Sequence, residues 1–472
     1  MINSNIEKLI PELKEVADLF DSSDFFNISH EFKLIEGEYL NFLKIEYKGV
    51  FCEYRYCDTP PAAFNELEEK RYIKRYAKLS LYKALSDLTG INMPWGALTG
   101  IRPTKLAYTE LKKTGEYKDF FKNFMLVSDK KLKIVEKILE TQKGIYSSGE
   151  GLTDFFIGIP FCPTRCRYCS FVSTDIRATK KLIPDYVAAL KREISAAKEL
   201  IKNLRSVYIG GGTPVAIGDE YLKQILETVK GCGTEFTVEA GRPDCITREN
   251  LKLLKDYGVT RICVNPQTFN DETLKRIGRF HTAQDVIDKF YLAKEYGFII
   301  NTDLIAGLDG ETSEDFKKTI ETTLKLRPDN ITVHTLCLKK GSKLKTEESR
   351  LSASGINEMV DFAHDRLGEN GYEPYYLYRQ KYMAGSLENT GYTLDGKACV
   401  YNVDVMEEIS DNVACGANAV SKFVDLKHEK ILRTAAPKNL PTYINKVEKV
   451  ITEKRGAFDE VEALRNLKEQ NP

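Results

Sequence analysis

Three closely spaced cysteines constrain this chain more than any other feature of its sequence. Cys162, Cys166 and Cys169 follow one another with the spacing C-x3-C-x2-C. An apolar run, residues 155–159, comes directly before them and is ended by Pro160, which predicts a buried strand with the cysteines on the loop that leaves its C-terminal end. Three thiolates on one loop can converge on one inorganic centre, and on a [4Fe–4S] cluster they would leave one iron open to a further ligand.

Two other interpretations of these cysteines stay open at this point. A zinc knuckle needs a fourth Cys or His close by, and the sequence places none there. A redox pair of Cys166 and Cys169 would suit a βαβ unit, but it leaves Cys162 without a role. Tyr168 lies between the second and third cysteines, where its aromatic face is expected to cover a ligand on the open iron.

The middle of the chain, residues 151–370, repeats a pattern of strand followed by helix. The apolar segments that predict strands begin near residues 155, 206, 235, 261, 300 and 330, and amphipathic helical patterns lie between them. Strands that alternate with helices indicate an α/β fold with a parallel sheet and right-handed crossovers. Six such units are too few for a closed eight-unit barrel, in which the chemistry lies at the C-terminal ends of the strands.

The segments on either side of this region have a different pattern. Residues 1–150 predict an α+β domain, in which segments 43–47 and 52–56 alternate as the two strands of a hairpin and a long helix ends at Gly90. Five basic residues lie on that helix, namely Lys70, Arg71, Lys74, Arg75 and Lys78. They could hold an anion, but a solvated helix face is the favoured interpretation. Residues 371–472 form a C-terminal region.

Composition excludes several classes of partner. The chain has 472 residues with 69 Lys+Arg and 69 Asp+Glu, so no overall field directs it to nucleic acid or to a membrane surface. Its 11 cysteines are odd in number and mostly scattered, which indicates a reducing compartment and hence a cytoplasmic location. The N-terminal segment lacks the pattern of a signal peptide, and no apolar run is long enough to span a membrane.

The longer string around the cysteines, GIPFCPTRCRYCSF at residues 158–171, resembles the oxygen-independent coproporphyrinogen III oxidases of the radical S-adenosylmethionine (SAM) superfamily. The resemblance covers essentially the whole chain and is greatest to the longer, HemZ-type members. It implies a partial (β/α)6 barrel at residues 151–370, an N-terminal α+β domain at residues 1–150, and a small C-terminal α+β domain at residues 371–472 that closes the barrel. It also implies a [4Fe–4S] cluster on the three cysteines, with SAM on the open iron.

The resemblance also implies which residues contact SAM. They are Tyr168, Ser170, Gly211, Gly212, Thr213, Glu239, Gln267, Arg279, Asp303 and Cys337. The glycines would let backbone groups approach the ligand without a Cβ in the way, although a GGGTP string can also be a simple tight turn. The polar residues could instead be structural groups of the barrel. The stretch at residues 414–422 resembles the segment that completes the nucleoside pocket in this family.

Two positions depart from the family pattern in the first strand of the barrel. Phe156 replaces a tyrosine of the bacterial oxidases, and Gly158 replaces a histidine. A role of that tyrosine hydroxyl in handling SAM or a proton is therefore absent here. The N-terminal domain is also much longer than in those oxidases, so substrate contacts cannot be carried over from them.

Substrate contacts are expected from both flanking segments. The string at residues 93–105 holds Trp95, Arg102 and Lys105, and the C-terminal region holds Arg379 and Lys381. Trp95 could pack on a flat tetrapyrrole or belong to the core, while the cations could pair with propionates. These residues predict a substrate that is clamped between the flanking domains, over the barrel.

The implied reaction is the oxidative decarboxylation of two propionates of coproporphyrinogen III to vinyl groups, which gives protoporphyrinogen IX in anaerobic haem biosynthesis. No catalytic residue is expected beyond the cluster and SAM, and a one-electron donor such as flavodoxin or ferredoxin would be a partner. Two alternatives stay open, a haem-binding or haem-delivery protein on the same scaffold and another tetrapyrrole-modifying radical SAM enzyme, such as a methyl transferase.

Overall fold

The computed structural model describes residues 1–60, 66–100, 102–146, 151–169, 173–232, 235–337, 353–380 and 387–466. Contacts divide the chain into two compact units, the first made of Met1–Glu136 with Gly385–Leu387 and the second of Lys137–Ala384 with Glu388–Pro472. The first boundary thus falls before the expected residue 150, and the C-terminal region shares a unit with the barrel strands.

Unit 1 is built on a four-stranded sheet with the order β1-β2-β3-β4. Its strands are β1 (Ile2–Ser4), β2 (Phe26–Ile35), β3 (Glu38–Tyr47) and β4 (Val50–Asp58), and its helices are α1 (Ile10–Phe20), α2 (Glu66–Thr89) and α3 (Pro103–Thr114), with α4 (Asp129–Thr141) crossing the unit boundary. The hairpin of β3 and β4 and the long helix α2 confirm the expected elements. Lys48 and Gly49 have positive φ at the hairpin turn, the conformation that a two-residue hairpin loop requires.

The basic residues of helix α2 are partnered by carboxylates of unit 1. Lys74 and Lys78 form ion pairs with Glu12 of α1, and Arg75 lies 3.4 Å from Glu110 of α3. These pairs support the interpretation of a solvated helix face and do not indicate an anion site.

Unit 2 contains an open sheet of 11 strands with the order β13-β14-β12-β11-β10-β9-β8-β5-β15-β16-β17. All six expected strands are present, as β5 (Leu152–Ile159), β8 (Asn203–Gly211), β9 (Glu235–Gly241), β10 (Arg261–Val264), β11 (Ile299–Ala306) and β12 (Asn330–Thr335). They pair in parallel in sequence order. The sheet is not closed, in agreement with the expected partial barrel.

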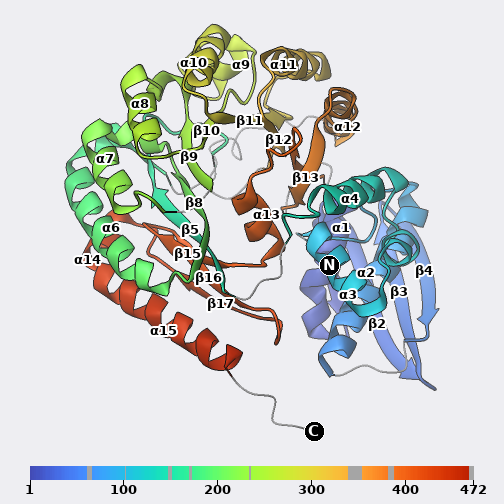
Figure 1. Ribbon diagram of the computed structural model, residues 1–472. Helices are drawn as coiled ribbons and strands as arrows, with labels where there is room; N and C mark the ends of the chain where they lie inside the picture. The colour runs from blue at the N-terminus through green and yellow to red at the C-terminus, as the bar shows by residue number, and fades with distance from the viewer. Residues whose placement is uncertain are drawn as a thin grey trace. The chain divides into compact units, whose positions relative to one another are not determined.

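Helices connect these strands and lie outside them (Figure 1). They are α5 (Ile176–Thr179), α6 (Ile183–Ala197), α7 (Asp219–Thr228), α8 (Arg248–Asp256), α9 (Asp271–Arg276), α10 (Ala283–Glu295), α11 (Ser313–Leu326) and α12 (Ala353–Glu369). Thr282 starts α10 and Thr312 starts α11, each through a capping box with an aspartate three residues later. Short 3-10 or π turns are η1 (Glu7–Leu9), η2 (Ser23–Phe25), η3 (Phe120–Phe124), η4 (Lys180–Leu182), η5 (Lys198–Leu200), η6 (Pro214–Ile217) and η7 (Pro243–Cys245).

The C-terminal segments extend the barrel sheet at both ends. β13 (Glu373–Tyr378) and β14 (Asn389–Thr393) pair antiparallel beyond β12, whereas β15 (Asp411–Cys415) pairs in parallel with β5 and is followed by β16 (Val420–Asp425) and β17 (Lys430–Ala435). Helices α13 (Val400–Glu407), α14 (Leu440–Asn445) and α15 (Val447–Arg465) complete the unit. The two short strands β6 (Phe161–Cys162) and β7 (Thr174–Asp175) form a separate parallel pair.

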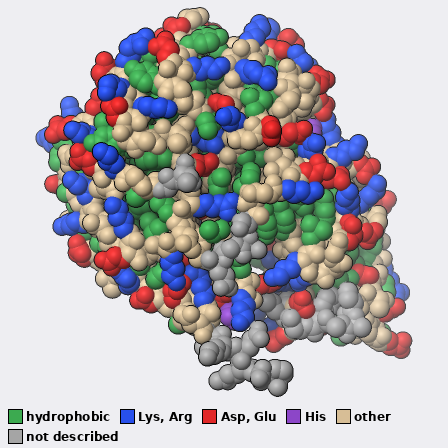
Figure 2. All heavy atoms as spheres, viewed as in Figure 1, with side chains coloured by type: hydrophobic (Ala, Val, Ile, Leu, Met, Phe, Trp, Pro, Cys, Tyr) green, Lys and Arg blue, Asp and Glu red, His purple; other side chains and the backbone are tan. Residues whose placement is uncertain are grey.

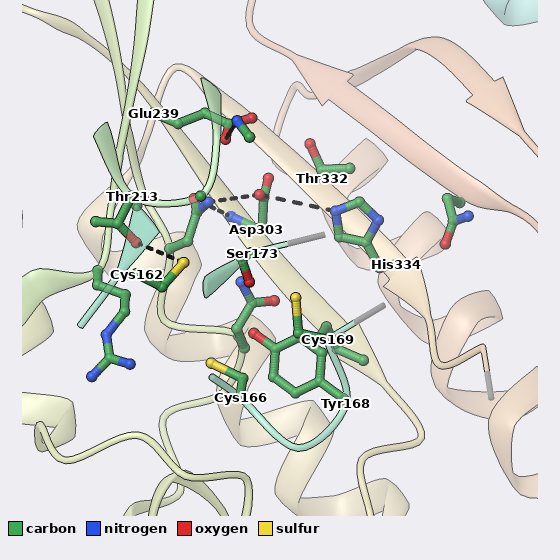
Figure 3. A pocket seen from close by; sticks show the side chains of 18 of the residues that line it. Cys162, Cys166, Tyr168, Cys169, Ser173, Thr213, Glu239, Asp303, Thr332 and His334 are labelled. Atoms are coloured by element: carbon green, nitrogen blue, oxygen red, sulfur yellow. Dashed lines mark hydrogen bonds and ion pairs between the residues drawn. The ribbon is translucent and has the colours of Figure 1, made fainter. Parts of the chain in front are cut away.

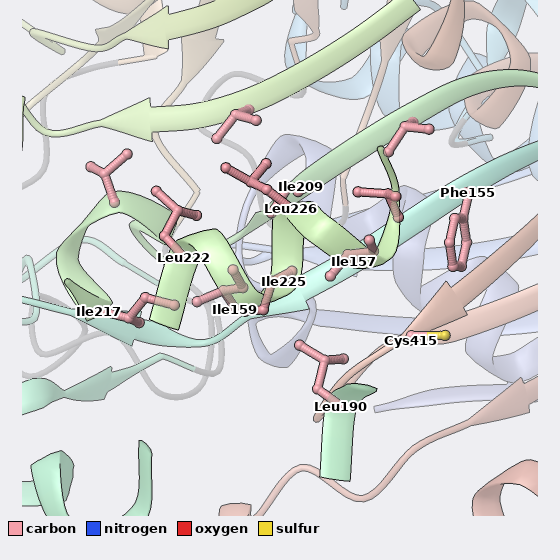
Figure 4. Packing of buried hydrophobic residues seen from close by; sticks show 14 of the residues in the cluster. Phe155, Ile157, Ile159, Leu190, Ile209, Ile217, Leu222, Ile225, Leu226 and Cys415 are labelled. Atoms are coloured by element: carbon pink, nitrogen blue, oxygen red, sulfur yellow. The ribbon is translucent and has the colours of Figure 1, made fainter. Parts of the chain in front are cut away.

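The core of unit 2 lies between the parallel strands and their helices (Figure 4). Ile157 and Ile159 of β5 pack with Ile209 of β8 and with Leu222 and Leu226 of α7, all of them fully buried. This packing places the C-terminal ends of β5 and β8 next to each other, which is where the cysteine loop and the glycine-rich segment begin.

The surface agrees with the balanced composition. Figure 2 shows Lys and Arg side chains interspersed with Asp and Glu over the visible face. Among the helices of the described residues, none has both the length and the apolar character that a membrane span requires.

Candidate functional site

A cavity of about 650 Å³ opens in unit 2 at the C-terminal ends of the barrel strands. Its volume lies within the range of ordinary small-molecule sites. Residues from β5, the cysteine loop, β8, β9, β11, β12, β13 and the loop after β15 line it. It is therefore where a barrel of parallel strands is expected to do its chemistry.

The three cysteines of the motif all line this cavity (Figure 3). Cys162 ends the short strand β6 and accepts a hydrogen bond at 3.7 Å from Thr213 Oγ1, and the loop beyond it is held by a bond from Cys169 N to Cys166 O. All three are free thiols. The loop thus presents three sulfur ligands to one space.

The three thiols could hold a [4Fe–4S] cluster. Three cysteines on one loop can each bind one iron of the cube and leave the fourth iron open to a further ligand.

The glycine-rich segment after β8 is shaped by close backbone approaches. A Cβ on Gly212 would lie 2.6 Å from Phe161 O, and Gly211 has φ +106°. A Cβ on Gly210 would meet the carboxyl carbon of Glu239 at 2.9 Å. A side chain at Gly212 would push the segment away from strand β6, and one at Gly210 would displace the carboxylate of Glu239, so this arrangement needs both glycines.

Glu239 presents a carboxylate to the cavity from the end of β9. Its Oε1 accepts a hydrogen bond from Tyr208 Oη at 2.7 Å, and its Oε2 accepts one from Gly211 N at 3.2 Å. Burial raises the pKa of Glu239 to about 7, although these two donors act against the shift. A cationic ligand would therefore favour the ionised carboxylate.

Gln267, which follows β10, lies beside Asp303 of β11 and donates its backbone N–H to the carbonyl of Asp303 at 3.0 Å. Gln267 has φ +68°, a left-handed conformation that is rare outside glycine, and its backbone bridges to β11 at Leu304. Asp303 accepts hydrogen bonds from Asn265 Nδ2 at 2.7 Å and from Asn301 Nδ2 at 2.8 Å. A residue with a strained backbone, such as Gln267, beside a hydrogen-bonded carboxylate, such as Asp303, is typical of a ligand site.

Arg279 is 4% exposed and lines the same cavity. Its guanidinium donates to Tyr168 Oη at 3.1 Å and to the carbonyl of Asn265. Its Nε has no hydrogen-bond partner among the described residues. The guanidinium thus keeps hydrogen-bonding capacity for an anionic group.

The structure brings together most of the residues expected at the cofactor site. Tyr168, Gly211, Gly212, Thr213, Glu239, Gln267, Arg279, Asp303 and Cys337 all line the cavity, as do Ala417, Asn418 and Ala419 of the segment at residues 414–422. Ser170 lies outside the described residues. Tyr168 also packs against an apolar group, formed by Leu274, Ile277, Ile305 and Leu308.

Arg379 is the one expected substrate residue that both lies in unit 2 and belongs to the described residues. Arg379 is 5% exposed and does not line the cavity, whereas its neighbours Tyr378 and Gln380 do, because successive side chains of an extended segment point to opposite faces. Burial lowers the pKa of Arg379 to about 10. Trp95 is 1% exposed, which favours its interpretation as a core residue.

Arg102 and Lys105 stand at the start of helix α3 in unit 1, and Lys381 lies outside the described residues. The clamp between the flanking domains stays a prediction.

Several polar lining residues were not expected from the sequence. They are Tyr208, Arg242, Asn265, Asn301, His334, Tyr378 and Asn389. A positional signal existed for two of them, since Arg242 and Asn265 each follow the last residue of a strand. His334 lies 4.0 Å from Asp303 and 3.4 Å from Tyr378 Oη, a contact between β11, β12 and β13 that no local pattern indicates.

The comparisons with known proteins agree with this site. The family model of the radical SAM superfamily matches residues 156–323. The oxygen-independent coproporphyrinogen-III oxidase-like protein HemZ of Bacillus subtilis is 37% identical over 414 residues, which are 82% of this chain and 82% of that protein. The heme chaperone HemW of the same organism is 36% identical over 193 residues, which are 39% of this chain and 50% of the chaperone.

Among solved structures, coproporphyrinogen III oxidase (HemN) of Escherichia coli matches with a TM-score of 0.52 and 20% identity, over 65% of this chain and 71% of that one. This likeness supports the fold. Superfamily membership also assigns the cofactors, a [4Fe–4S] cluster and SAM. The chain therefore belongs to the radical SAM superfamily and, within it, to the family of oxygen-independent coproporphyrinogen III oxidase-like proteins.

Proposed function

We propose that this protein is a radical SAM oxidoreductase that converts two propionates of coproporphyrinogen III to vinyl groups and so forms protoporphyrinogen IX. One observation carries the proposal, a single cavity that joins three cysteine thiols to a wall of aromatic rings. The rings belong to Phe156, Tyr208, Tyr376, Tyr378 and Tyr401. A tetrapyrrole is large, flat and mostly apolar, and such rings pack well against it.

The aromatic wall is organised before any ligand arrives. The rings of Tyr208 and Tyr401 are stacked with centroids 4.4 Å apart, and Phe156 stacks beside both. Tyr376 and Tyr378 stack with an interplanar angle of 3°. Stacked rings lose little freedom when a flat substrate binds, so the wall is suited to holding one orientation.

The polar residues of the cavity have a consistent division of roles. Glu239 would bind the SAM ammonium, Arg279 its carboxylate, and Asp303 the ribose hydroxyls, because each charge or donor meets its complement. When bound, the cluster and SAM would supply the one-electron chemistry that removes a hydrogen atom from the propionate, after which CO2 would be released and one electron would pass to an external one-electron acceptor. The protein orients the reactants and excludes water.

The cavity also limits where the propionates can go. Among the described lining residues, the groups that can carry a positive charge are Arg242, Arg279 and His334. Arg242 is already held by both carboxylate oxygens of Asp244, at 2.9 and 2.7 Å. The propionates that Arg279 and His334 do not meet therefore need cations outside this lining.

A second function, haem binding or delivery, is favoured by His334. It is a histidine that lines the cavity, and burial lowers its pKa, which keeps the imidazole neutral and able to ligate iron. Similarity to the heme chaperone HemW over part of the chain points in the same direction. This function would need no decarboxylation.

An anaerobic assay separates the two functions. The reconstituted full-length protein is incubated with reductant, SAM and coproporphyrinogen III, with Cys162→Ala as the inactive control. Formation of 5′-deoxyadenosine together with a vinyl product supports the proposal. SAM cleavage without any change of the tetrapyrrole would refute it, and S-adenosylhomocysteine would indicate methyl transfer instead.

Haem titration tests the alternative directly. Stoichiometric binding that is lost in His334→Ala but kept in His364→Ala, with no vinyl product from either protein, would favour haem delivery.

A further inference from the structure

We propose that a buried ion pair between Lys454 and Glu193 is a positioning device that sets the shape of the SAM pocket. It joins the C-terminal helix α15 to helix α6 and acts through the loop at residues 416–419. This inference depends on SAM as the cofactor and not on the identity of the substrate, so it can fail or hold independently of the proposed decarboxylation.

The pair is buried and fully engaged. Lys454 is 3% exposed and Glu193 is 1% exposed, and Lys454 Nζ lies 2.6 Å from Glu193 Oε1. The other carboxylate oxygen accepts hydrogen bonds from Gly416 N at 2.8 Å and from Tyr443 Oη at 2.5 Å. Lys454 Nζ also lies 3.4 Å from Cys415 Sγ. The carboxylate is therefore an anchor for the backbone directly after strand β15.

The anchored loop has little freedom of its own. Gly416 has φ +111°, and a Cβ there would lie 2.5 Å from Gly158 O. Tyr186 Oη donates to Gly158 O at 2.7 Å and accepts from Ala417 N at 3.1 Å, so it ties the loop to the end of β5. The loop and the first barrel strand are thus held in one arrangement by α6.

The loop in turn forms one wall of the cavity. Ala417, Asn418 and Ala419 line it together with the cysteines and the glycine-rich segment. The wall is made of small side chains and backbone, so its position depends on what holds the backbone from behind. Glu193 and Tyr186 hold this backbone without lining the cavity themselves.

A buried ion pair is seldom needed for stability alone, because apolar residues of similar volume can replace it at little cost. Removing one partner leaves an unpaired buried charge and destabilises the fold. Replacing both partners therefore separates a role in stability from a role in positioning the loop at residues 416–419. An apolar pair keeps the packing but takes away the acceptor of the Gly416 amide.

The test uses the anaerobically reconstituted full-length protein and measures SAM affinity by equilibrium dialysis, iron content, and the midpoint of chemical unfolding. We expect the double variant Glu193→Leu/Lys454→Met to keep its iron and to bind SAM about tenfold more weakly, as for the loss of a buried hydrogen bond, while its unfolding midpoint falls because Gly416 N and Tyr443 Oη lose their acceptor. Glu193→Gln/Lys454→Met keeps an acceptor oxygen for Gly416 and should restore the affinity to within about twofold.

Two further variants complete the test. Tyr186→Phe removes only the hydroxyl that ties the loop to β5, and it should weaken SAM binding in the same direction. Arg455→Met removes an exposed ion pair between α15 and Glu199, directly after α6, and should leave SAM affinity unchanged. The proposal is overturned if Tyr186→Phe and the apolar pair bind SAM as the wild type does, or if the Gln variant fails to recover affinity. Should the apolar pair not fold, Tyr186→Phe decides by itself.

Discussion

Glu235 and Glu239 have the same side chain and lie on the same face of strand β9, since residues i and i+4 of a strand point the same way. Their surroundings are nevertheless opposite. At the N-terminal end of the strand, Glu235 is surrounded by protein donors. At the C-terminal end, Glu239 lines the cavity.

The partners of Glu235 complete its hydrogen bonding. It accepts from Arg261 Nη2 at 3.2 Å and from the backbone amides of Val400 and Tyr401, at 3.1 and 3.2 Å. Those amides belong to the first turn of α13, where a carboxylate is favourable because helix N-termini carry unpaired N–H groups. Glu235 therefore serves the fold by joining β9, β10 and α13.

Glu239 has fewer partners. Among the described residues, the hydrogen-bond donors to its carboxylate are Tyr208 Oη and the amide of Gly211. The pKa of Glu239 is raised to about 7, because burial is not offset by a cation. A cationic ligand would therefore stabilise the ionised carboxylate of Glu239, whereas the carboxylate of Glu235 already has its cation in Arg261.

The same division recurs on the other strands. Arg261 and Asn265 are four residues apart on and after β10, and Asn330 and His334 are four apart on β12. Arg261 and Asn330 bond to each other and to the carbonyl of Lys397 at the N-terminal end, whereas Asn265 and His334 line the cavity. Contacts at the N-terminal end of the barrel thus hold the fold together, whereas residues at its C-terminal end line the cavity. Substitutions at the N-terminal end should lower the free energy of unfolding, and those at the C-terminal end should weaken the binding of iron or SAM.

The largest effect is expected from the cysteines at the C-terminal end. Cys162→Ala, Cys166→Ala or Cys169→Ala should each remove most of the iron and the visible spectrum of the cluster, because a cube with one ligand fewer is open at two irons. Iron analysis after anaerobic reconstitution checks this. Cys263→Ala and Cys232→Ala are the controls, since neither residue lines the cavity. Equal loss of iron in Cys263→Ala would contradict the three-cysteine site.

Arg261→Met should give the largest loss of stability. Arg261 is 2% exposed, and without it the largely buried carboxylate of Glu235 keeps its two amide donors but loses its cation, at a cost of about 3 kcal/mol in the free energy of unfolding. Urea unfolding of the protein measures the change. The double variant Glu235→Gln/Arg261→Met should recover part of it, because the amide is neutral and still accepts from the helix. A single variant that unfolds like the wild type but binds SAM weakly would break the division between the two ends.

The sequence predicted the parts of this comparison that depend on local order. The apolar runs predicted all six parallel strands, and the cysteine spacing and the glycines predicted the end of the barrel at which the cavity lies. The N-terminal end could not be predicted, because its contacts join distant segments. Asp154 bonds to Ser410, 256 residues away, and Glu235 bonds to Val400, 165 residues away.

Side-chain direction was the other limit. Arg379 was expected at the substrate, but the extended segment turns it away from the cavity and presents Tyr378 and Gln380 there. The phase of that alternation depends on how β13 pairs with β14, with a register shift between Pro374 and Tyr376. A local pattern does not contain this information.

Asp404 at the N-terminal end should give a smaller, pH-dependent effect. Burial raises the pKa of Asp404 to about 8 and that of the neighbouring Asp154 to about 6. The folded protein therefore takes up protons that the unfolded chain releases above about pH 4, so the stability contributed by the pair is present at low pH and is lost as the pH rises towards 8. Asp404→Asn should flatten this decline between pH 5 and 8, as measured by urea unfolding.

A carboxylate with the opposite shift provides the control for Asp404. Hydrogen bonds from the backbone and hydroxyl of Thr312 lower the pKa of Asp315. Its contribution to stability is present above the unfolded pKa and is lost as the pH falls, so Asp315→Asn should reduce stability at neutral pH and not flatten the decline towards pH 8. Parallel curves for the wild type and Asp404→Asn would mean that the buried pair does not titrate in this range.

The smallest effect is expected from Tyr208→Phe, which leaves the ring stacked on Tyr401 but removes the hydroxyl that donates to Glu239. That hydrogen bond lowers the pKa of Glu239 against the effect of burial, so its loss should raise the pKa further. If the ionised Glu239 holds the SAM ammonium, affinity for SAM increases as the pH rises through this pKa, and the variant should shift the increase to higher pH.

Equilibrium dialysis between pH 6 and 9 measures the shift, and Tyr401→Phe, which keeps the hydroxyl of Tyr208, is the matched control. An unshifted profile in Tyr208→Phe would mean that Glu239, like Glu235, is a structural carboxylate, and the contrast between the two ends of β9 would then rest on position alone.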